Sequence, residues 1–191
     1  MRRSNRSALL LAFLLAAPLR AQSGTLWSLQ ASGLYVGLSG DAYSGLDAGV
    51  GAEGQLRYNF VNGWSLGAGV QASRHKFSED FGLLEDLTLM GAFVEPRKVL
   101  PIGRSKVAPY LSGRLALLSQ RTKVLGESVG ATGLQVNAGG GLLFSLSPRA
   151  NLDFGATVGA VGFGKYANVG SEAGSGSNFV MRVGLSLGLG K

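Results

Sequence analysis

Residues 46–58 read LDAGVGAEGQLRY, and their side chains alternate between two kinds. Val50 and Leu56 have one parity, while Glu53 and Arg57 have the other. Successive side chains of a β-strand point to opposite faces, so this stretch predicts a strand with one apolar face and one polar face.

The same two-residue period recurs along the rest of the chain, strongly in four further segments and more weakly in three. The predicted strands are 27–39, 46–58, 64–73, 86–95, 107–118, 134–146, 152–166 and 179–189. The 31 glycines recur inside these apolar stretches and do not gather in one linker. Eight evenly spaced strands predict an all-β fold, an eight-stranded antiparallel up-and-down barrel.

The predicted connections differ in length. Residues 61–63 and 147–151 have the Gly, Pro and Asn content of tight turns, while three other connections, 77–85, 119–131 and 167–177, are longer and polar. Transmembrane barrels have short turns at the periplasmic end and longer loops at the outer end. The connection 96–105 is longer than a periplasmic turn requires.

The N-terminus has the features of a secretory signal peptide. Arg2 and Arg3 precede the apolar run ALLLAFLLAA at 8–17, and Ala21 provides a small residue for cleavage. Ten apolar residues would rise only about 15 Å as a helix, too little to span a bilayer. We therefore expect residues 1–21 to be a signal peptide and residues 22–191 to be one barrel domain.

The net charge of +7 is misleading, because four arginines belong to the predicted signal peptide. The remainder has 14 basic and 11 acidic residues, a formal charge of +3. These basic residues are scattered, whereas nucleic-acid binding needs a contiguous basic patch, so we expect no nucleic-acid partner. The absence of cysteine excludes disulfides and thiolate metal sites.

The composition of the two faces favours a membrane barrel over a soluble one. The polar parity is rich in Gly, Ser, Asn and Gln and has few charges, which suits a narrow packed lumen. The apolar parity has aromatic residues toward the strand ends, as in interfacial girdles: Tyr58, Phe60, Trp64, Phe144, Tyr166 and Phe179. We expect the apolar parity of each strand to face lipid. A soluble, lipocalin-like ligand-binding barrel is the alternative.

Several segments resemble the small outer-membrane β-barrel family of OmpA-like, porin-family proteins. Residues 108–115 (APYLSGRL) resemble the Pro-Tyr segment that opens its fifth strand. Residues 63–70 (GWSLGAGV) and 139–148 are similar to its strand and turn sequences. The resemblance implies a cell outer membrane of the Gram-negative type and a lipid surrounding.

The C-terminal residues 182–189 (RVGLSLGL) resemble the strand by which such barrels are recognised by the barrel-assembly machinery, although the chain ends at Lys191 and lacks the family's aromatic last residue. We expect a monomer with no periplasmic peptidoglycan-binding domain. The extracellular ligand of the loops is not identified by any motif.

The charged residues on the polar parity are the candidate functional residues. A charge in a lumen must be paired or hydrated, so we expect a salt-bridge network that fills the barrel. Its predicted members are Asp47, Glu53, Arg57, Arg114, Asp153, Lys165 and Arg182.

No catalytic, cofactor-binding or metal-binding residue is predicted. The Gly-rich stretch 49–54 matches a dinucleotide fingerprint by spelling but lies inside a strand, where that motif does not work. We therefore expect a structural, adhesion or loop-mediated recognition protein without a wide pore. The alternatives are a narrow channel for ions or small solutes, and a lipid or peptide hydrolase at the rim that uses His75, the only histidine.

Overall fold

The computed structural model describes residues 26–77, 86–100, 102, 105–124, 127–166 and 173–189. The elements of these residues are β1 (Trp27–Ser39), η1 (Asp41–Tyr43), β2 (Gly49–Asn59), η2 (Val61–Gly63), β3 (Trp64–His75), β4 (Leu87–Val99), β5 (Val107–Val124), β6 (Glu127–Ser147), β7 (Ala150–Phe163) and β8 (Ser175–Leu189). Among them, no helix is both long and apolar enough to span a bilayer. The predicted signal peptide, residues 1–21, lies outside the described residues.

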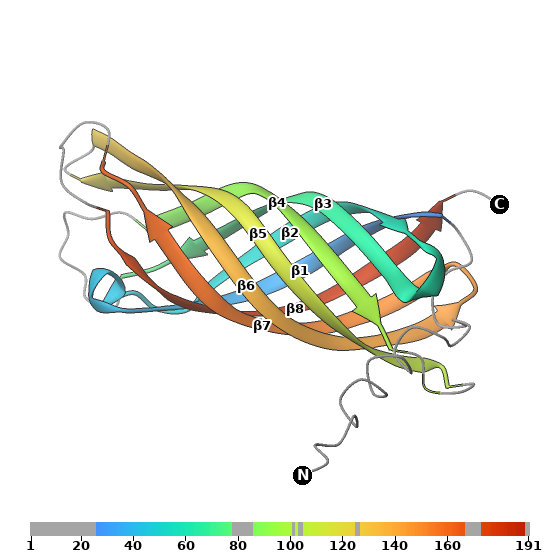
Figure 1. Ribbon diagram of the computed structural model, residues 1–191. Helices are drawn as coiled ribbons and strands as arrows, with labels where there is room; N and C mark the ends of the chain where they lie inside the picture. The colour runs from blue at the N-terminus through green and yellow to red at the C-terminus, as the bar shows by residue number, and fades with distance from the viewer. Residues whose placement is uncertain are drawn as a thin grey trace, which may run out of the picture.

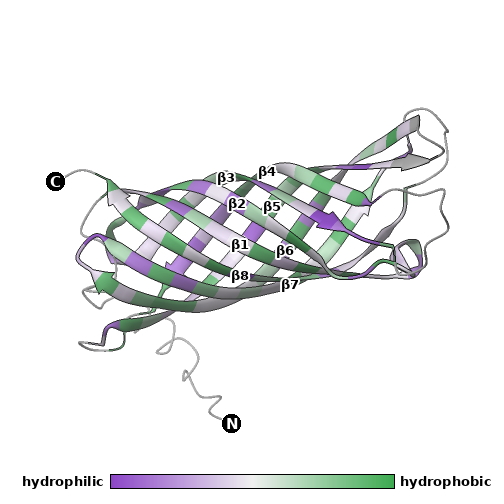
Figure 2. Ribbon diagram, turned by 180° about the vertical axis from the view of Figure 1, so that it is seen from behind, coloured by the Kyte–Doolittle hydropathy of each residue, from purple (hydrophilic) through white to green (hydrophobic). Residues whose placement is uncertain are grey.

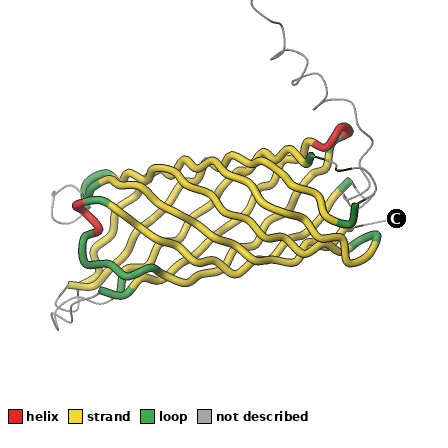
Figure 3. Tube along the Cα trace, turned by 90° about the horizontal axis from the view of Figure 1, so that it is seen from below, coloured by secondary structure: helices red, strands yellow, loops and turns green. Residues whose placement is uncertain are grey.

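Each strand pairs antiparallel with the next, and β8 pairs with β1 to close the barrel (Figure 1). Trp27, where β1 begins, lies opposite Leu189, where β8 ends. The first strand therefore starts at the same rim at which the last strand finishes. We call this end the terminal rim and the opposite end the distal rim. The strands cross at a tilt on every side, and the connections lie at the two rims (Figure 3).

The polar parity faces the lumen and the apolar parity faces outward. In β2, Glu53, Gln55 and Arg57 are buried, while Val50 and Leu56 are exposed. Figure 2 shows this alternation along the ribbons. An outer face this apolar is favourable in contact with lipid tails and unfavourable in contact with water. The predicted transmembrane barrel is therefore confirmed.

An aromatic girdle surrounds part of the terminal rim. The rings of Trp27, Tyr58 and Phe60 stack edge to face, with successive centroids 4.9 Å apart. Aromatic rings of this kind lie at the boundary between lipid tails and headgroups. Tyr166 does not belong to it, contrary to the prediction: its ring packs against apolar residues inside the barrel, and its hydroxyl accepts a hydrogen bond from Gln120 Nε2 at 2.8 Å.

The predicted long loop 119–131 is wrong. β5 continues to Val124, and its partner strand β6 begins at Glu127, with Ser119 opposite Thr132. The backbone pairing of β5 and β6 extends beyond the apolar part of the wall. The outward and inward side chains are both polar there, so the sequence no longer alternates between apolar and polar residues. Residues 78–85 and 167–172 of the other predicted loops lie outside the described residues.

The connection after β4 is also shorter than predicted, because β4 includes Pro96 and ends at Val99. Pro96 lies opposite Leu66 of β3. On the β5 side, the recorded pairs are Val94 with Leu115 and Arg97 with Ser112, so the ladder is interrupted around the proline. Proline lacks an N–H for such a ladder, but here it does not end the strand.

The lumen is not polar throughout. In β4, the parity that contains Leu87, Leu89 and Phe93 faces inward, so the prediction that these residues face lipid is wrong. Leu34 and Val36 of β1 also point inward. Leu87, Leu89 and Phe93 belong to one apolar cluster and Leu34 and Val36 to another, and Leu38 packs against both clusters.

Candidate functional site

Three groups of buried residues follow one another through much of the barrel between the rims. The first, at the terminal rim, is a small apolar cluster: Val99, Ala108, Tyr110 and Leu143. The second, which we call the charge layer, consists of Glu53, Arg57, Glu95, Arg97, Arg114, Asp153 and Arg182. The third, which we call the distal plug, consists of Tyr43, Leu87, Leu89, Phe93, Ala116, Leu118, Ala131, Val161, Phe163 and Ala173.

Glu95 of β4 is the centre of the charge layer, and its residue is 0% exposed. Its Oε1 accepts hydrogen bonds from Arg57 Nη2 at 2.7 Å and Arg97 Nη2 at 3.1 Å. Its Oε2 accepts hydrogen bonds from Arg114 Nη2 and Arg182 Nη1, both at 2.6 Å. Four guanidinium groups from four strands therefore converge on one carboxylate.

Asp153 of β7 is a second acceptor and is also 0% exposed. Its Oδ2 lies 2.8 Å from Arg97 Nη2 and accepts a hydrogen bond from Gln30 Nε2 at 2.8 Å. Its Oδ1 accepts a hydrogen bond from the Tyr110 hydroxyl at 2.7 Å, and that hydroxyl accepts one from Arg182 Nη2 at 3.0 Å. Tyr110 thus links the charge layer to the apolar cluster at the terminal rim.

Glu53 of β2 completes the layer on the side of the distal plug. Its Oε2 accepts a hydrogen bond from Arg114 Nη1 at 2.7 Å. The Arg114 guanidinium carbon lies 3.9 Å from the centroid of the Phe93 ring, so this arginine makes a cation–π contact with the plug. The two layers are therefore in direct contact.

The described charge layer holds four arginines and three carboxylates, a formal charge of +1. Three of the arginines, Arg57, Arg97 and Arg182, each have a buried Nε without a hydrogen-bond partner among the described protein atoms. Buried ionised groups depend on each other, because an uncompensated charge in low dielectric is costly. The layer is thus a single coupled unit.

Glycines in the wall make room for these large side chains. A Cβ at Gly155 would meet the Tyr110 hydroxyl and lie 2.8 Å from Arg182 Nε. A Cβ at Gly67 would meet Gln55 Oε1 and lie 2.9 Å from Arg57 Nη2. Some glycines of the wall are therefore needed because a larger residue would collide with the side chains that fill the narrow lumen.

Five of the seven sequence-predicted residues lie together in the charge layer: Glu53, Arg57, Arg114, Asp153 and Arg182. The other two, Asp47 and Lys165, do not join it, and their inclusion was wrong because both side chains are exposed near the distal rim, beyond the ends of β2 and β7.

Sequence reasoning missed Glu95 and Arg97, the residues that connect the others. Both share a parity with Leu87, Leu89 and Phe93, which that reasoning assigned to lipid. Continuing the alternation through Pro96 would have placed Glu95 and Arg97 on one face of a longer strand.

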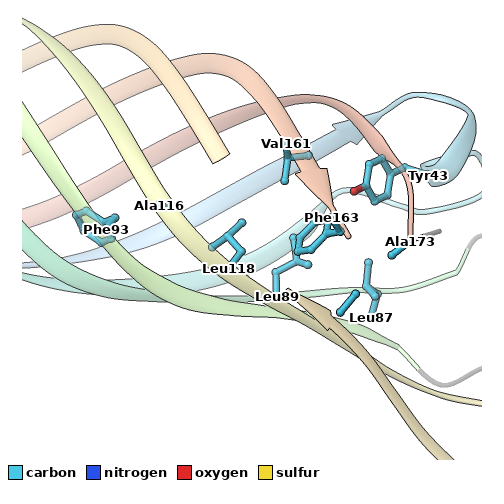
Figure 4. Packing of buried hydrophobic residues seen from close by; sticks show 10 residues of the cluster. Tyr43, Leu87, Leu89, Phe93, Ala116, Leu118, Val161, Phe163 and Ala173 are labelled. Carbon is cyan, nitrogen blue, oxygen red and sulfur yellow. The ribbon is translucent and has the colours of Figure 1, made fainter. Parts of the chain in front are cut away.

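The distal plug closes the lumen above the charge layer. Figure 4 shows Leu87, Leu89, Leu118 and Phe163 inside the barrel, with the Tyr43 ring entering from η1. Tyr43 is 4% exposed, and its hydroxyl has no hydrogen-bond partner among the described protein atoms. Burial raises the pKa of Tyr43 to about 12, and nearby Tyr166 contributes to the shift.

A cavity of about 10 Å³ lies in the lumen, lined by residues that include Gln71, Gln135, Leu118 and Val180. This volume corresponds to about one water molecule. By itself this cavity is not a continuous aqueous path through the barrel.

His75 and Ser73 form the one serine–histidine contact seen in the described part of the chain. Ser73 Oγ lies 3.1 Å from His75 Nε2, and His75 Nδ1 lies 3.3 Å from the backbone oxygen of Asp47. Among the described residues, the backbone carbonyl of Asp47 is the group that orients the far side of the imidazole ring. His75 is 0% exposed and Ser73 is buried, and both side chains point into the lumen.

Among residues with described positions, no three His, Cys, Asp or Glu side chains are arranged to hold a metal ion. The Gly-rich stretch 49–54 lies within β2, with no following helix that could bind a pyrophosphate.

Comparison with known proteins identifies the fold. No family model and no curated protein matches the chain. Among solved structures, Neisserial surface protein A has 19% identity over 85% of this chain and 97% of its own, with a TM-score of 0.66.

Two further structures are similar. Ail, the attachment invasion locus protein of Yersinia pestis, has 17% identity over 84% of this chain and 96% of its own, with a TM-score of 0.55. The outer membrane protein OprG from Pseudomonas aeruginosa has 12% identity over 89% of this chain and 98% of its own, with a TM-score of 0.51. By its closed eight-stranded architecture and these similarities, this chain has the fold of the small outer-membrane β-barrels.

Proposed function

We propose that this chain is a monomeric outer-membrane barrel of a Gram-negative-type bacterium that forms no diffusion pore. Its role is structural, adhesive or recognitional, exerted at the outer rim and the lipid-facing wall. The observation that carries this proposal is the double closure of the lumen by the charge layer and the distal plug.

A diffusion pore requires a continuous hydrated path, and the lumen offers none among the described residues. Every side chain of the charge layer belongs to a residue no more than 5% exposed. The distal plug adds a stretch of packed apolar side chains, which water does not enter at equilibrium. An eight-stranded barrel is only wide enough to be filled by its own side chains.

The lengths of the connections orient the barrel in the membrane. At the terminal rim, β2 joins β3 through η2, and β6 joins β7 through two residues. At the distal rim, β1 joins β2 through the nine residues 40–48. Because outer-membrane barrels have their short turns in the periplasm, we assign the distal rim to the cell exterior.

The proposed function also includes a route of export to the outer membrane. Residues 1–21 would be removed as a signal peptide. β8 would then be the strand recognised by the barrel-assembly machinery, and its thirteen recorded pairs with β1 close the wall.

Planar-bilayer conductance tests the closed lumen. Protein whose folding has been verified by a gel shift between unheated and boiled samples in SDS should produce no conductance steps above the lipid baseline. Reproducible steps that disappear after boiling would overturn the closed lumen and favour the narrow channel. Recovery from the soluble periplasmic fraction without a gel shift would instead favour the lipocalin-like alternative.

A strain that lacks the protein tests the role at the outer rim. Compared with its complemented parent, this strain should show altered detergent sensitivity or altered attachment of cells to surfaces, with unchanged uptake of small solutes. A defect in solute uptake alone would contradict the proposed role.

A further inference from the structure

A broad groove lies on the outer face of the barrel wall, across β2 to β6. Its volume is about 730 Å³, and its lining includes Ala52, Gly54, Ala72, Met90, Ala92 and Leu117. The groove is open along the wall, and the lumen-facing residues Glu53, Gln71 and Leu118 also contribute atoms to its lining. It lies on the face that the proposed function exposes to lipid tails.

Small side chains in register produce this groove. Ala52, Ala72 and Met90 lie opposite one another on β2, β3 and β4. One step nearer the terminal rim, Gly54 lies opposite Val70, and an added Cβ at Gly54 would meet no atom within 4 Å. The wall is therefore depressed where most of its outward-facing side chains elsewhere are large.

Basic side chains lie directly beyond the groove on the distal side. Arg74 of β3 lies opposite Thr88 of β4, and Thr88 lies opposite Arg121 of β5. Arg74 follows Ala72 on the same face, about 7 Å further along the strand. Two strand spacings separate the two arginines, about 10 Å across the sheet.

Both arginines are exposed. Arg74 pairs with Asp86 through a contact of 2.7 Å, and 71% of the Arg74 side chain remains exposed. Arg74, Arg121 and Asp86 together carry a formal charge of +1. Ser119 and Thr132 lie in the same cross-strand row as Ala72 and Met90. Their hydroxyl groups can donate hydrogen bonds.

Along the outer wall toward the distal rim, the side chains change from apolar in the groove to basic at Arg74 and Arg121. A membrane changes in the same way at the boundary between acyl chains and headgroups. A guanidinium group binds phosphate oxygens through paired hydrogen bonds. A ligand that satisfies both parts of the pattern has a phosphate group and acyl chains.

We propose that this groove and its arginines bind an anionic, phosphate-bearing lipid of the outer leaflet. This inference rests on the proposed function, because the orientation places Arg74 and Arg121 at the height of the outer-leaflet headgroups. The lining of the groove lies on five neighbouring strands, about 19 Å measured along the curved wall, which is room for more than one acyl chain. A second copy of the chain is disfavoured as the occupant, because a symmetric contact through this face would bring the arginines of two copies together.

Native mass spectrometry of the folded full-length protein tests the site. Wild-type protein should retain lipid A more tightly than phosphatidylcholine. Arg121→Gln should weaken lipid A retention at least tenfold, and Ala92→Leu, which fills the groove, should weaken it similarly. Neither change should alter phosphatidylcholine retention.

Two matched controls separate a specific site from general contact with lipid. Arg149→Gln removes an exposed arginine at the terminal rim, and Ala156→Leu enlarges an outward alanine on β7, away from the groove. Both should retain lipid A as wild-type protein does. Equal retention by all four variants would overturn the site, and a dimer that Ala92→Leu dissociates would identify a second copy as the occupant.

Failure of this site can be distinguished from failure of the proposed function. Loss of specific lipid binding in a protein that shows the gel shift and no conductance would overturn the site alone. Absence of the gel shift would overturn the membrane barrel itself.

Discussion

Arg182 of β8 and Glu95 of β4 lie 87 positions apart in the sequence, yet they form a paired contact inside the barrel. Arg182 Nη1 donates to Glu95 Oε2 at 2.6 Å, and Arg182 Nη2 donates to Glu95 Oε1 at 3.1 Å. The contact crosses the lumen between two strands that are not neighbours in the wall. It therefore exists only after the wall is closed.

Glu95→Gln should strongly destabilise the barrel, because it removes the charge on which four arginines converge. Breaking a buried ion pair by removal of one partner costs about 3–5 kcal/mol. Urea unfolding in lipid bilayers, followed by tryptophan fluorescence, measures the change in the free energy of unfolding.

Asp86→Asn is the matched control, because it removes a carboxylate from a partly exposed pair, in which 71% of the Arg74 side chain and 25% of the Asp86 side chain are exposed. Its effect should stay below about 1 kcal/mol. If Glu95→Gln had an equally small effect, the charge layer would have to be hydrated, and the closed lumen would be wrong.

Gly155→Ala should destabilise the barrel by about 1–3 kcal/mol through overpacking against Tyr110 and Arg182. Gly54→Ala adds the same methyl group on the outer wall, where no atom lies within 4 Å, and should change stability by less than about 0.5 kcal/mol. The same unfolding assay compares the two. Equal effects would show that the methyl group changes strand propensity and not the packing of the lumen.

Tyr43→Phe should preserve or raise stability, because it removes a buried hydroxyl that has no partner among the described protein atoms. Tyr43→Ala should lower stability, because it leaves a cavity in the distal plug. Thermal loss of the gel shift ranks the three proteins. A loss of stability in Tyr43→Phe comparable to that in Tyr43→Ala would mean that a bound water satisfies the hydroxyl.

The raised pKa of Tyr43 also predicts a dependence on pH. The pKa of Tyr43 in the folded protein is about 12, above the ordinary tyrosine value of 10.0, so the unfolded chain loses this proton first as the pH rises. The contribution of Tyr43 to the free energy of unfolding is complete below pH 10 and is lost as the pH rises from 10 to 12. The unfolding free energy of wild-type protein should fall more steeply in this window than that of Tyr43→Phe, and parallel curves would contradict the burial of the ring.

Ser73→Ala and His75→Asn should leave ester hydrolysis at the background level of the wild-type protein. The pair points into the lumen, and His75 is oriented by the backbone oxygen of Asp47. Release of p-nitrophenol from short and long acyl esters measures the activity in detergent. Hydrolysis by wild-type protein that both variants abolish while keeping the gel shift would restore the rim hydrolase.

The alternation of residues along the chain determined the number of strands, their order and the polar character of much of the lumen. These properties follow from the local geometry of a strand, in which neighbouring side chains point to opposite faces. The same alternation identified Glu53, Arg57 and Arg114 as inward charges. Local periodicity contains enough information for each of these assignments.

Only the closed tertiary structure decided which parity of β4 faces inward and which charges meet. Leu87 and Phe93 have the same parity as Glu95, so the pattern of that strand alone could not distinguish an apolar plug from a lipid-facing surface. Asp47 and Lys165 have the parity of lumen residues but lie beyond the ends of their strands, where parity no longer determines direction. Pairing across a lumen depends on wall closure, register and strand length, and these are set by contacts between residues far apart in the chain.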